Sequence, residues 1–84
     1  MEEQIRAVLE AYGRLPHPVA TITRADDLYR AGLTSHASVN VMLGLEDAFD
    51  VEFPDSMLRK STFESIESIE SALRELADSS QLPA

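Results

Sequence analysis

Apolar residues recur at helical spacing in three separate stretches of this chain, and that pattern constrains its fold more than any other feature. In the first stretch they fall at positions i, i+3, i+4 and i+7, namely Ile5, Val8, Leu9 and Tyr12. This spacing is typical of the buried stripe of an amphipathic helix. We therefore expect a helix from about Glu2 to Gly13, where glycine can supply the C-terminal stop.

A long ordered loop is predicted after this helix. Pro16-His17-Pro18 forbids regular helix, and turn-forming residues follow as far as Gly32. Isolated apolar residues interrupt this stretch at Val19, Ile22, Leu28 and Leu33. Because long loops are uncommon in compact domains unless they have a function, we expect this one to pack across the helices, with Leu28 and Leu33 as its anchors.

The second predicted helix begins with Thr34 or Ser35 as its N-cap and ends near Asp50. At about 100° per residue, its core face carries Val41, Leu45, Ala48 and Phe49. Another face continues from Ser35 and mixes apolar with acidic groups: His36, Val39, Leu43, Glu46, Asp47 and Asp50, with Asn40 at its margin. An apolar patch rimmed by charge is typical of a protein interaction site. The alternative is that the loop covers Val39 or Leu43 and that the acids merely solvate the helix.

The last third of the chain predicts two further helices. The segment Asp55 to Lys60 can form a short one, and Ser61-Thr62-Phe63-Glu64 fits a capping box that opens the last. That last helix has regular apolar spacing, at Ile66, Ile69, Leu73 and Leu76. Residues 79–84 lack periodicity and contain a proline, so we expect a flexible tail after a single domain of residues 1–78. The predicted fold class is all-α, a four-helix bundle with three main helices, one short helix and a long first loop.

The composition restricts the partners of the chain. Fifteen acidic and 7 basic residues give a formal net charge of −8. This charge repels nucleic acid and anionic membranes, and it favours partners with basic protein surfaces. The chain starts Met1-Glu2-Glu3, without the features of a signal peptide, and no apolar run is long enough to span a bilayer. We expect a soluble, cytoplasmic monomer.

The chain contains no cysteine, so no protein thiol is available as a nucleophile, a thioester carrier or a metal ligand. The two histidines, His17 and His36, have no spacing that argues for zinc or calcium. Ser35 and His36 point about 100° apart on a helix, so adjacency does not make them a catalytic pair. We predict no catalytic residue and no metal site, and sulfur chemistry would require an attached cofactor.

Ser35 is the candidate site of modification. The first amide N–H groups of a helix lack intrahelical partners, and the helix macrodipole is positive there. A phosphate attached to Ser35 would therefore be well accommodated. Ser38 is a rival one turn further along the helix.

The residues around Ser35 resemble the acyl carrier protein family. The matching elements, at matching spacings, are Gly32-Leu33-Thr34-Ser35, Val39, Leu45-Glu46-Asp47, Phe49 and Phe53-Pro54. The resemblance covers about residues 3–77. The usual family signature is Gly-Leu-Asp-Ser-Leu, so Thr34 stands where Asp is usual and His36 where Leu is usual. The resemblance implies an acyl-carrier-like bundle in which Ser35 carries 4′-phosphopantetheine, donated covalently by coenzyme A.

The resemblance also implies a set of partners. A phosphopantetheinyl transferase would install the arm, and acyl- or aminoacyl-loading ligases and downstream transferases would dock through basic patches. The protein itself would not be an enzyme. The resemblance and the mixed helix face together give the candidate partner-binding residues as Thr34, His36, Val39, Asn40, Leu43, Glu46, Asp47 and Asp55.

Several alternatives stay open. The local sequence looks nearest to small stand-alone bacterial aminoacyl carrier proteins, and a polyketide, lipid or peptide-synthesis carrier is the alternative cargo class. An explanation of a different class is an unmodified acidic helical protein-interaction module, in which Ser35 serves only as a helix cap. Gly44 either permits close approach of another chain or of the arm, or is a tolerated surface glycine.

Overall fold

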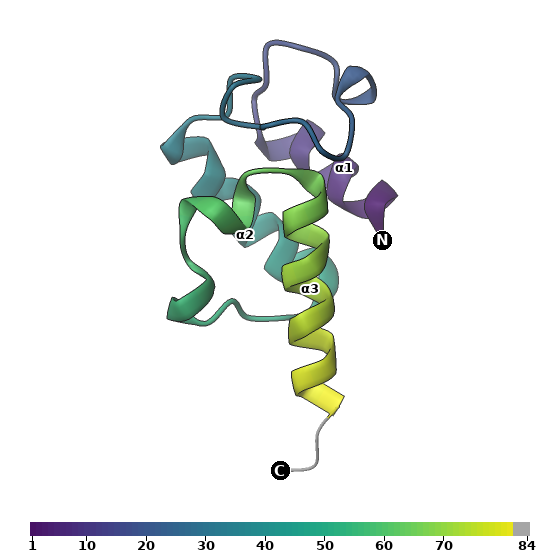
Figure 1. Cartoon of the computed structure of the whole chain (residues 1–84), viewed down its shortest axis with the longest axis vertical. Coiled ribbons are helices and arrows are strands. Elements are labelled where there is room, and N and C mark those ends of the chain that lie inside the picture. Colours follow the sequence, from purple (N-terminus) through teal and green to yellow (C-terminus); the bar gives the residue numbers. More distant parts are fainter. Residues whose placement is uncertain (82–84) are drawn as a thin grey trace.

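In the described part of the chain, three α-helices are joined by a long loop and by three short 3-10 segments, η1 within that loop and η2 and η3 after the second helix (Figure 1). The computed structural model describes the backbone of residues 1–81 and the side chains of residues 1–77. The elements in chain order are α1 (Glu2–Tyr12), η1 (Val19–Thr21), α2 (Ser35–Phe49), η2 (Asp55–Met57), η3 (Lys60–Phe63) and α3 (Ile66–Gln81). The predicted all-α class is confirmed. The short helix expected over residues 55–60 is instead the 3-10 turn η2, followed separately by η3.

The core forms where the apolar stripes of α1, α2 and α3 meet the loop. The fully buried side chains are Ile5, Leu9, Leu28, Val41, Leu45, Ile66, Ile69 and Leu73. Two core predictions were wrong, because Tyr12 is 46% exposed and Ala48 is exposed.

Gly44 lets α1 and α2 approach closely. A Cβ atom at this position would lie 2.7 Å from the Tyr12 ring and 2.9 Å from a Val8 methyl group. Neither expectation for Gly44 was right, since its neighbour is α1 of the same chain. The ring of Tyr12 therefore covers the helix backbone instead of entering the core.

The long loop between α1 and α2 is ordered and anchored as predicted. Its four isolated apolar residues are all buried: Val19, Ile22, Leu28 and Leu33. The Arg6 guanidinium donates hydrogen bonds to the carbonyl oxygens of Val19 and Ile22, at 2.9 and 2.7 Å. The loop also meets the start of α3, where the Leu28 N–H donates to the Glu64 carbonyl at 2.7 Å. These bonds hold the loop against both α1 and α3.

The cap of α3 differs from the predicted capping box. The Ser65 hydroxyl accepts from the Ser68 N–H, and the Ser68 hydroxyl accepts from the Ser65 N–H, both at 3.0 Å. The expected box at residues 61–64 was wrong because residues 60–63 form η3. Helix α3 runs to Gln81, past the residue 78 where we expected the domain to end, and residues 82–84 of the expected tail lie outside the described residues.

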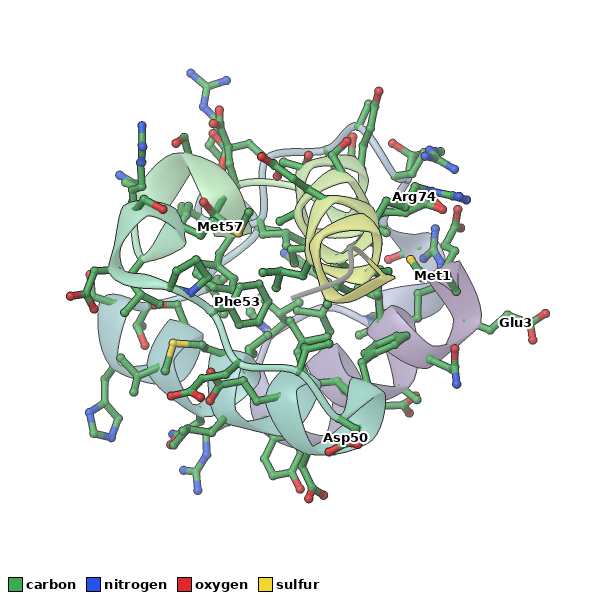
Figure 2. All side chains as sticks on the ribbon, turned by 90° about the horizontal axis from the view of Figure 1, so that it is seen from below. Met1, Glu3, Asp50, Phe53, Met57 and Arg74 are labelled. Atoms are coloured by element: carbon green, nitrogen blue, oxygen red, sulfur yellow. The ribbon has the colours of Figure 1, made fainter. Side chains whose placement is uncertain are left out.

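Glu46 joins the end of α2 to the segment that follows. Asp50 ends the helix in the left-handed conformation, with φ of 52°, and the Glu46 carboxylate accepts a hydrogen bond from the Phe53 N–H at 2.8 Å. Phe53 lies inside the molecule (Figure 2), where its ring meets Phe63 edge to face at 5.5 Å between centroids. The Glu46 carboxylate thus helps to place the connection that leads to η2.

A network of charged side chains joins α1, the loop and α3. Arg24 donates to Glu70 at 2.6 Å and to Glu2 at 3.1 Å. Glu2 also pairs with Arg6 at 3.0 Å, and Glu70 with Arg74 at 3.3 Å. The hydrogen bond from Arg24, supported by Arg74, holds the pKa of the Glu70 carboxyl below its ordinary value.

Glu70→Gln should lower the melting temperature at neutral pH and flatten its dependence on pH. Because the pKa of Glu70 is lower in the folded protein, its contribution to stability is present above the ordinary value near 4.5. That contribution is lost as the pH falls through the folded-state pKa. Thermal melts between pH 3 and 7 measure this, with Glu75→Gln, an exposed acid on the same helix, as control. Parallel pH profiles for the two variants would contradict the assignment.

Glu46→Ala should lower the free energy of unfolding by about 1–2 kcal/mol, because the Phe53 N–H loses a charged acceptor. Its neighbour Asp47 is exposed, so Asp47→Ala should change the same quantity by less than about 0.5 kcal/mol. Urea denaturation of both variants measures the difference. Equal losses would show that the Glu46–Phe53 hydrogen bond contributes nothing to folding.

Candidate modification site

The loop residues before α2 determine where that helix starts. Leu33 is buried, and its N–H donates to the Leu28 carbonyl at 2.9 Å. Gly32 has a φ of +116°, and a Cβ there would lie only 2.5 Å from the Cδ atom of Pro16. Glycine is therefore required at position 32 for two independent reasons, the backbone conformation and the contact with Pro16. The Gly-Leu pair positions the two residues that follow.

Thr34 is the N-cap of α2, and this leaves Ser35 free. The Thr34 hydroxyl accepts a hydrogen bond from the Ala37 N–H at 3.0 Å. Ser35 is the first residue of the 15-residue helix, it is exposed, and its hydroxyl makes no hydrogen bond within the described part of the chain. The rival Ser38 is half-buried, and its hydroxyl donates to the Ser35 carbonyl at 2.7 Å. Ser35 therefore has the accessible hydroxyl, and the helix does not need it as a cap.

The start of α2 is electrically positive. No acceptor among the described residues meets the backbone N–H of Ser35 or of His36. Free N–H groups at the start of a long helix favour an adjacent anion by about 0.3–1 kcal/mol when exposed. His36 is exposed and lines a small hollow of about 240 Å³ together with Arg14, Thr34 and Asn40.

A mostly apolar groove opens beside Ser35. Its volume is about 310 Å³, and α2 supplies one side while the η2–η3 segment supplies the other. The lining residues are Tyr29, Ser35, Ser38, Val39, Met42, Leu58, Arg59, Lys60 and Phe63. The Lys60 ammonium lies 4.8 Å from the centroid of the Tyr29 ring. Ser35 thus borders a cleft with apolar sides and a basic group on the same rim.

The exposed face of α2 is continuous with Ser35. Residues four apart in a helix lie one above the other, and Ser35, Val39, Leu43 and Asp47 form such a row along α2, about 18 Å long. Val39 is 52% and Leu43 53% exposed, so the alternative in which the loop covers them was wrong. Leu58 of the facing segment is 45% exposed. An apolar surface of this kind beside a modifiable hydroxyl suits a transient partner.

The predicted partner-binding residues differ in their exposure to solvent. Thr34, His36 and Asp55 are exposed, like Val39, Leu43 and Asp47, whereas Asn40 and Glu46 are only half-exposed. Sequence reasoning missed Tyr29, Leu58, Arg59 and Lys60, because they join Ser35 only through the folding of the loop and of η2–η3. It also missed Met42, although this residue lies on α2, two turns after Ser35. The adjacent pair Arg59-Lys60 in so acidic a chain was the one signal available.

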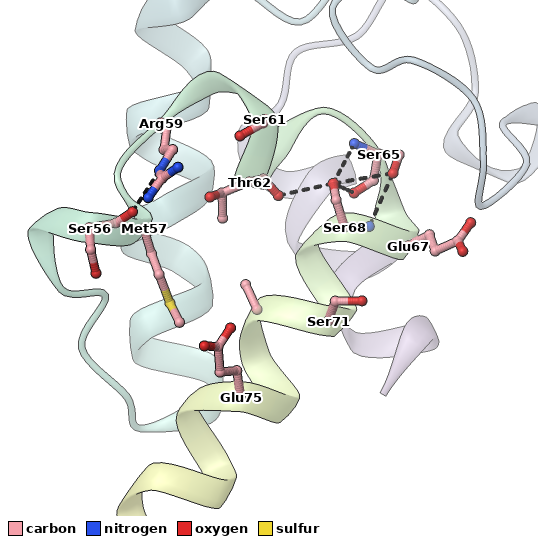
Figure 3. Close-up of a pocket in the computed structure, with 11 residues that line it drawn as sticks. Ser56, Met57, Arg59, Ser61, Thr62, Ser65, Glu67, Ser68, Ser71 and Glu75 are labelled. Carbon is pink, nitrogen blue, oxygen red and sulfur yellow. Dashed lines mark hydrogen bonds between the residues drawn. The ribbon is translucent and has the colours of Figure 1, made fainter.

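A second groove lies between η2–η3 and α3 and shares Arg59 with the groove beside Ser35 (Figure 3). Its volume is about 540 Å³, and hydroxyl groups dominate its lining. The hydroxyls of Ser65 and Ser68 already form the hydrogen bonds that cap α3, and the Ser68 hydroxyl also donates to the Thr62 carbonyl at 3.1 Å. The groove is larger than the one beside Ser35, but two of its hydroxyls, those of Ser65 and Ser68, serve the fold.

Two further findings bear on the site. Within the described residues, no three histidine or acidic side chains gather as metal ligands would. None of the helices in the described part is both long and apolar enough to cross a membrane.

Comparisons with known proteins agree with this geometry. A family model described as a phosphopantetheine attachment site matches residues 4–73. The aminoacyl carrier protein of Agrobacterium fabrum is 50% identical over 93% of this chain and 94% of its own length.

Solved structures give the same result. A crystal structure of an engineered Bradyrhizobium japonicum glycine:[carrier protein] ligase, with a carrier protein from Agrobacterium tumefaciens and AMP, contains a chain 51% identical to this one. The TM-score is 0.87, over 88% of this chain and 99% of that one. A second structure, of the Bradyrhizobium japonicum ligase with glycylated carrier protein, matches at 32% identity and a TM-score of 0.72, over 84% and 95% of the two chains.

The resemblance to the acyl carrier family is thereby confirmed. The fold, the exposed serine at the start of α2 and the match over residues 4–73 lead to one conclusion. This chain belongs to the family of carrier proteins that bear covalently bound phosphopantetheine.

Proposed function

We propose that this chain is an aminoacyl carrier protein whose phosphopantetheine arm is attached to Ser35. The observation that carries the proposal is the free, exposed hydroxyl of Ser35 at the first residue of α2, in a chain of this family. Amino acids are the proposed cargo because the relatives at 50% identity and above include an aminoacyl carrier protein and a carrier solved with a glycine ligase. The unmodified interaction module is not favoured, since Thr34 alone caps the helix.

The residues around Ser35 suit the chemistry of this arm. The arm joins an anionic phosphodiester to a long, mainly uncharged chain that ends in a thiol. The free N–H groups at the start of α2 favour the anion, and the adjacent groove offers apolar sides for the chain. When bound, the arm supplies the thiol that holds an aminoacyl group as a thioester, which this cysteine-free chain cannot provide itself.

Attachment uses only the hydroxyl of Ser35. Its oxygen forms a bond to the phosphorus of coenzyme A that bears the pantetheine, the bond to the 3′,5′-ADP part breaks, and the hydroxyl proton is released. The base and the metal for this step belong to the phosphopantetheinyl transferase. We propose that the chain itself has no catalytic role and presents Ser35 on a rigid helix to the enzymes that act on it.

The row Val39, Leu43 and Asp47 is the proposed docking surface for the loading ligase and for later transferases. The apolar pair supplies contact area, while Asp47 lies further along α2 and attracts basic groups. Exposed charges of this kind contribute only about 0–1 kcal/mol each, so they chiefly raise the rate of association. Weak complexes suit a carrier that must exchange partners.

Ser35→Ala should abolish modification. Incubation with coenzyme A and a broad-specificity phosphopantetheinyl transferase, followed by intact-protein mass spectrometry, should add one phosphopantetheine to the natural chain and none to the variant. Ser38→Ala is the matched control and should be modified like the natural chain. Modification of Ser35→Ala, or failure of the natural chain with several transferases, would overturn the proposal.

Asp47→Lys should slow association with a glycine:[carrier protein] ligase by about 3- to 10-fold at low salt, with a smaller effect at high salt. The structure argues against reversing Glu46 at the same time, because its carboxylate binds the Phe53 N–H and the fold would change as well. Glu10→Lys, on the exposed side of α1, carries the same change of charge as control. Stopped-flow or surface-binding kinetics measure the rates, and equal slowing by both variants would remove Asp47 from the docking surface.

A further inference from the structure

The basic residues of the chain are unevenly distributed. Of the seven, three form salt bridges, namely Arg6, Arg24 and Arg74. Arg59 and Lys60 lie side by side in sequence, and both line the groove beside Ser35. Neither pairs with a carboxylate in the described part of the chain, although acids outnumber bases by 15 to 7. Two cations without a carboxylate partner at one groove of so acidic a protein suggest that the groove binds an anion.

Both side chains have local contacts that leave their charge available. The Arg59 Nε donates to the Ser56 carbonyl at 2.7 Å, which leaves the terminal nitrogens of the guanidinium without an acceptor among the described residues. The Lys60 ammonium rests over the Tyr29 ring at 4.8 Å. A cation–π contact at an exposed site is worth about 0.5–1 kcal/mol, so an anion can compete with it.

We propose that Arg59 and Lys60 form a cationic clamp for the phosphodiester of the arm on Ser35, which thereby rests along the groove. This inference rests on the proposed attachment at Ser35. Arginine and lysine are the side chains that bind phosphate oxygens most strongly, through charge-assisted hydrogen bonds. Ser35 and the two cations line the same cleft, so an anion attached to Ser35 would share that cleft with two positive charges.

The apolar lining of the same cleft can hold the part of the arm that follows the phosphate. Val39, Met42 and Phe63 offer apolar surface between Ser35 and the η2–η3 segment, against which the uncharged chain beyond the phosphate can rest. Arg59 and Lys60 therefore favour a state in which the arm lies on its own protein. A ligase must compete with this state, so the clamp sets how readily the thiol becomes available.

The small hollow on the other side of the start of α2 supplies basic residues for a control variant. Arg14 and His36 line it, but Ser35 does not. Arg14 is exposed and forms no ion pair within the described residues, as is also true of Arg30. The double variant Arg14→Gln/Arg30→Gln therefore removes the same charge as Arg59→Gln/Lys60→Gln without touching the groove lining.

The test compares the unmodified and phosphopantetheinylated forms of three proteins: the natural chain, Arg59→Gln/Lys60→Gln, and Arg14→Gln/Arg30→Gln. In the natural chain at low salt, the modified form should melt about 2–5 °C higher than the unmodified form, a difference that salt should reduce. Arg59→Gln/Lys60→Gln should remove at least half of that rise, whereas the control pair should keep it. NMR should show side-chain shifts of Arg59 and Lys60 on modification of the natural chain.

The outcomes separate this inference from the proposed function. Absence of any mass increase on the natural chain would remove the attachment at Ser35 itself. Complete modification with the same rise in melting temperature in all three proteins, and with no shift of the Arg59 and Lys60 signals, would overturn the clamp alone. Weaker ligase binding by Arg59→Gln/Lys60→Gln, with an unchanged melting difference, would also overturn it and assign the two cations to the partner.

Discussion

The burial of Leu28 and Leu33 is the constraint on which the rest of this structure depends. The loop between α1 and α2 contains little regular structure, and the part of it that leads into α2 is held by these two anchors and by the hydrogen bonds that join Leu28 to Glu64 and Leu33 to Leu28. Because Leu33 precedes the cap residue Thr34 directly, fixing Leu33 also fixes the residue at which α2 begins. Packing of these apolar side chains therefore also determines where the exposed hydroxyl of Ser35 lies.

The charges of the chain are divided between two tasks. Arg6, Arg24 and Arg74 are used with Glu2 and Glu70 to join α1, the loop and α3. That use of three cations leaves the exposed face of α2 with acids that have no internal partner, such as Asp47. Because these cations are held in structural ion pairs, they do not neutralise the exposed acids of α2, in agreement with the proposal that basic groups of a partner dock there.

Periodicity in the sequence was enough to predict the three main helices and the loop anchors, because each depends on local spacing. Attachment at Ser35 came from the resemblance to the carrier family and from its place at a helix start, and it stays a prediction. Two of the failures were tertiary, and one was the choice of a local helix cap. The exposure of Tyr12 followed from Gly44, where a side chain would collide with the ring. The true cap of α3 used two serines, Ser65 and Ser68, in place of the expected Ser–Glu pair. The groove residues from η2–η3 could not be found, since no local pattern brings Lys60 to Tyr29.

Glu46 lies on the exposed side of α2 but also takes part in the fold, so it is not freely available to a partner. It lies on the helix that partners would read, yet its carboxylate is committed to the Phe53 N–H and so to the placement of η2. A partner that bound Glu46 would have to break that bond or accept only its remaining oxygen. Recognition that leaves the fold intact must rely on residues without internal bonds, and the row from Ser35 through Val39 and Leu43 to Asp47 meets that condition.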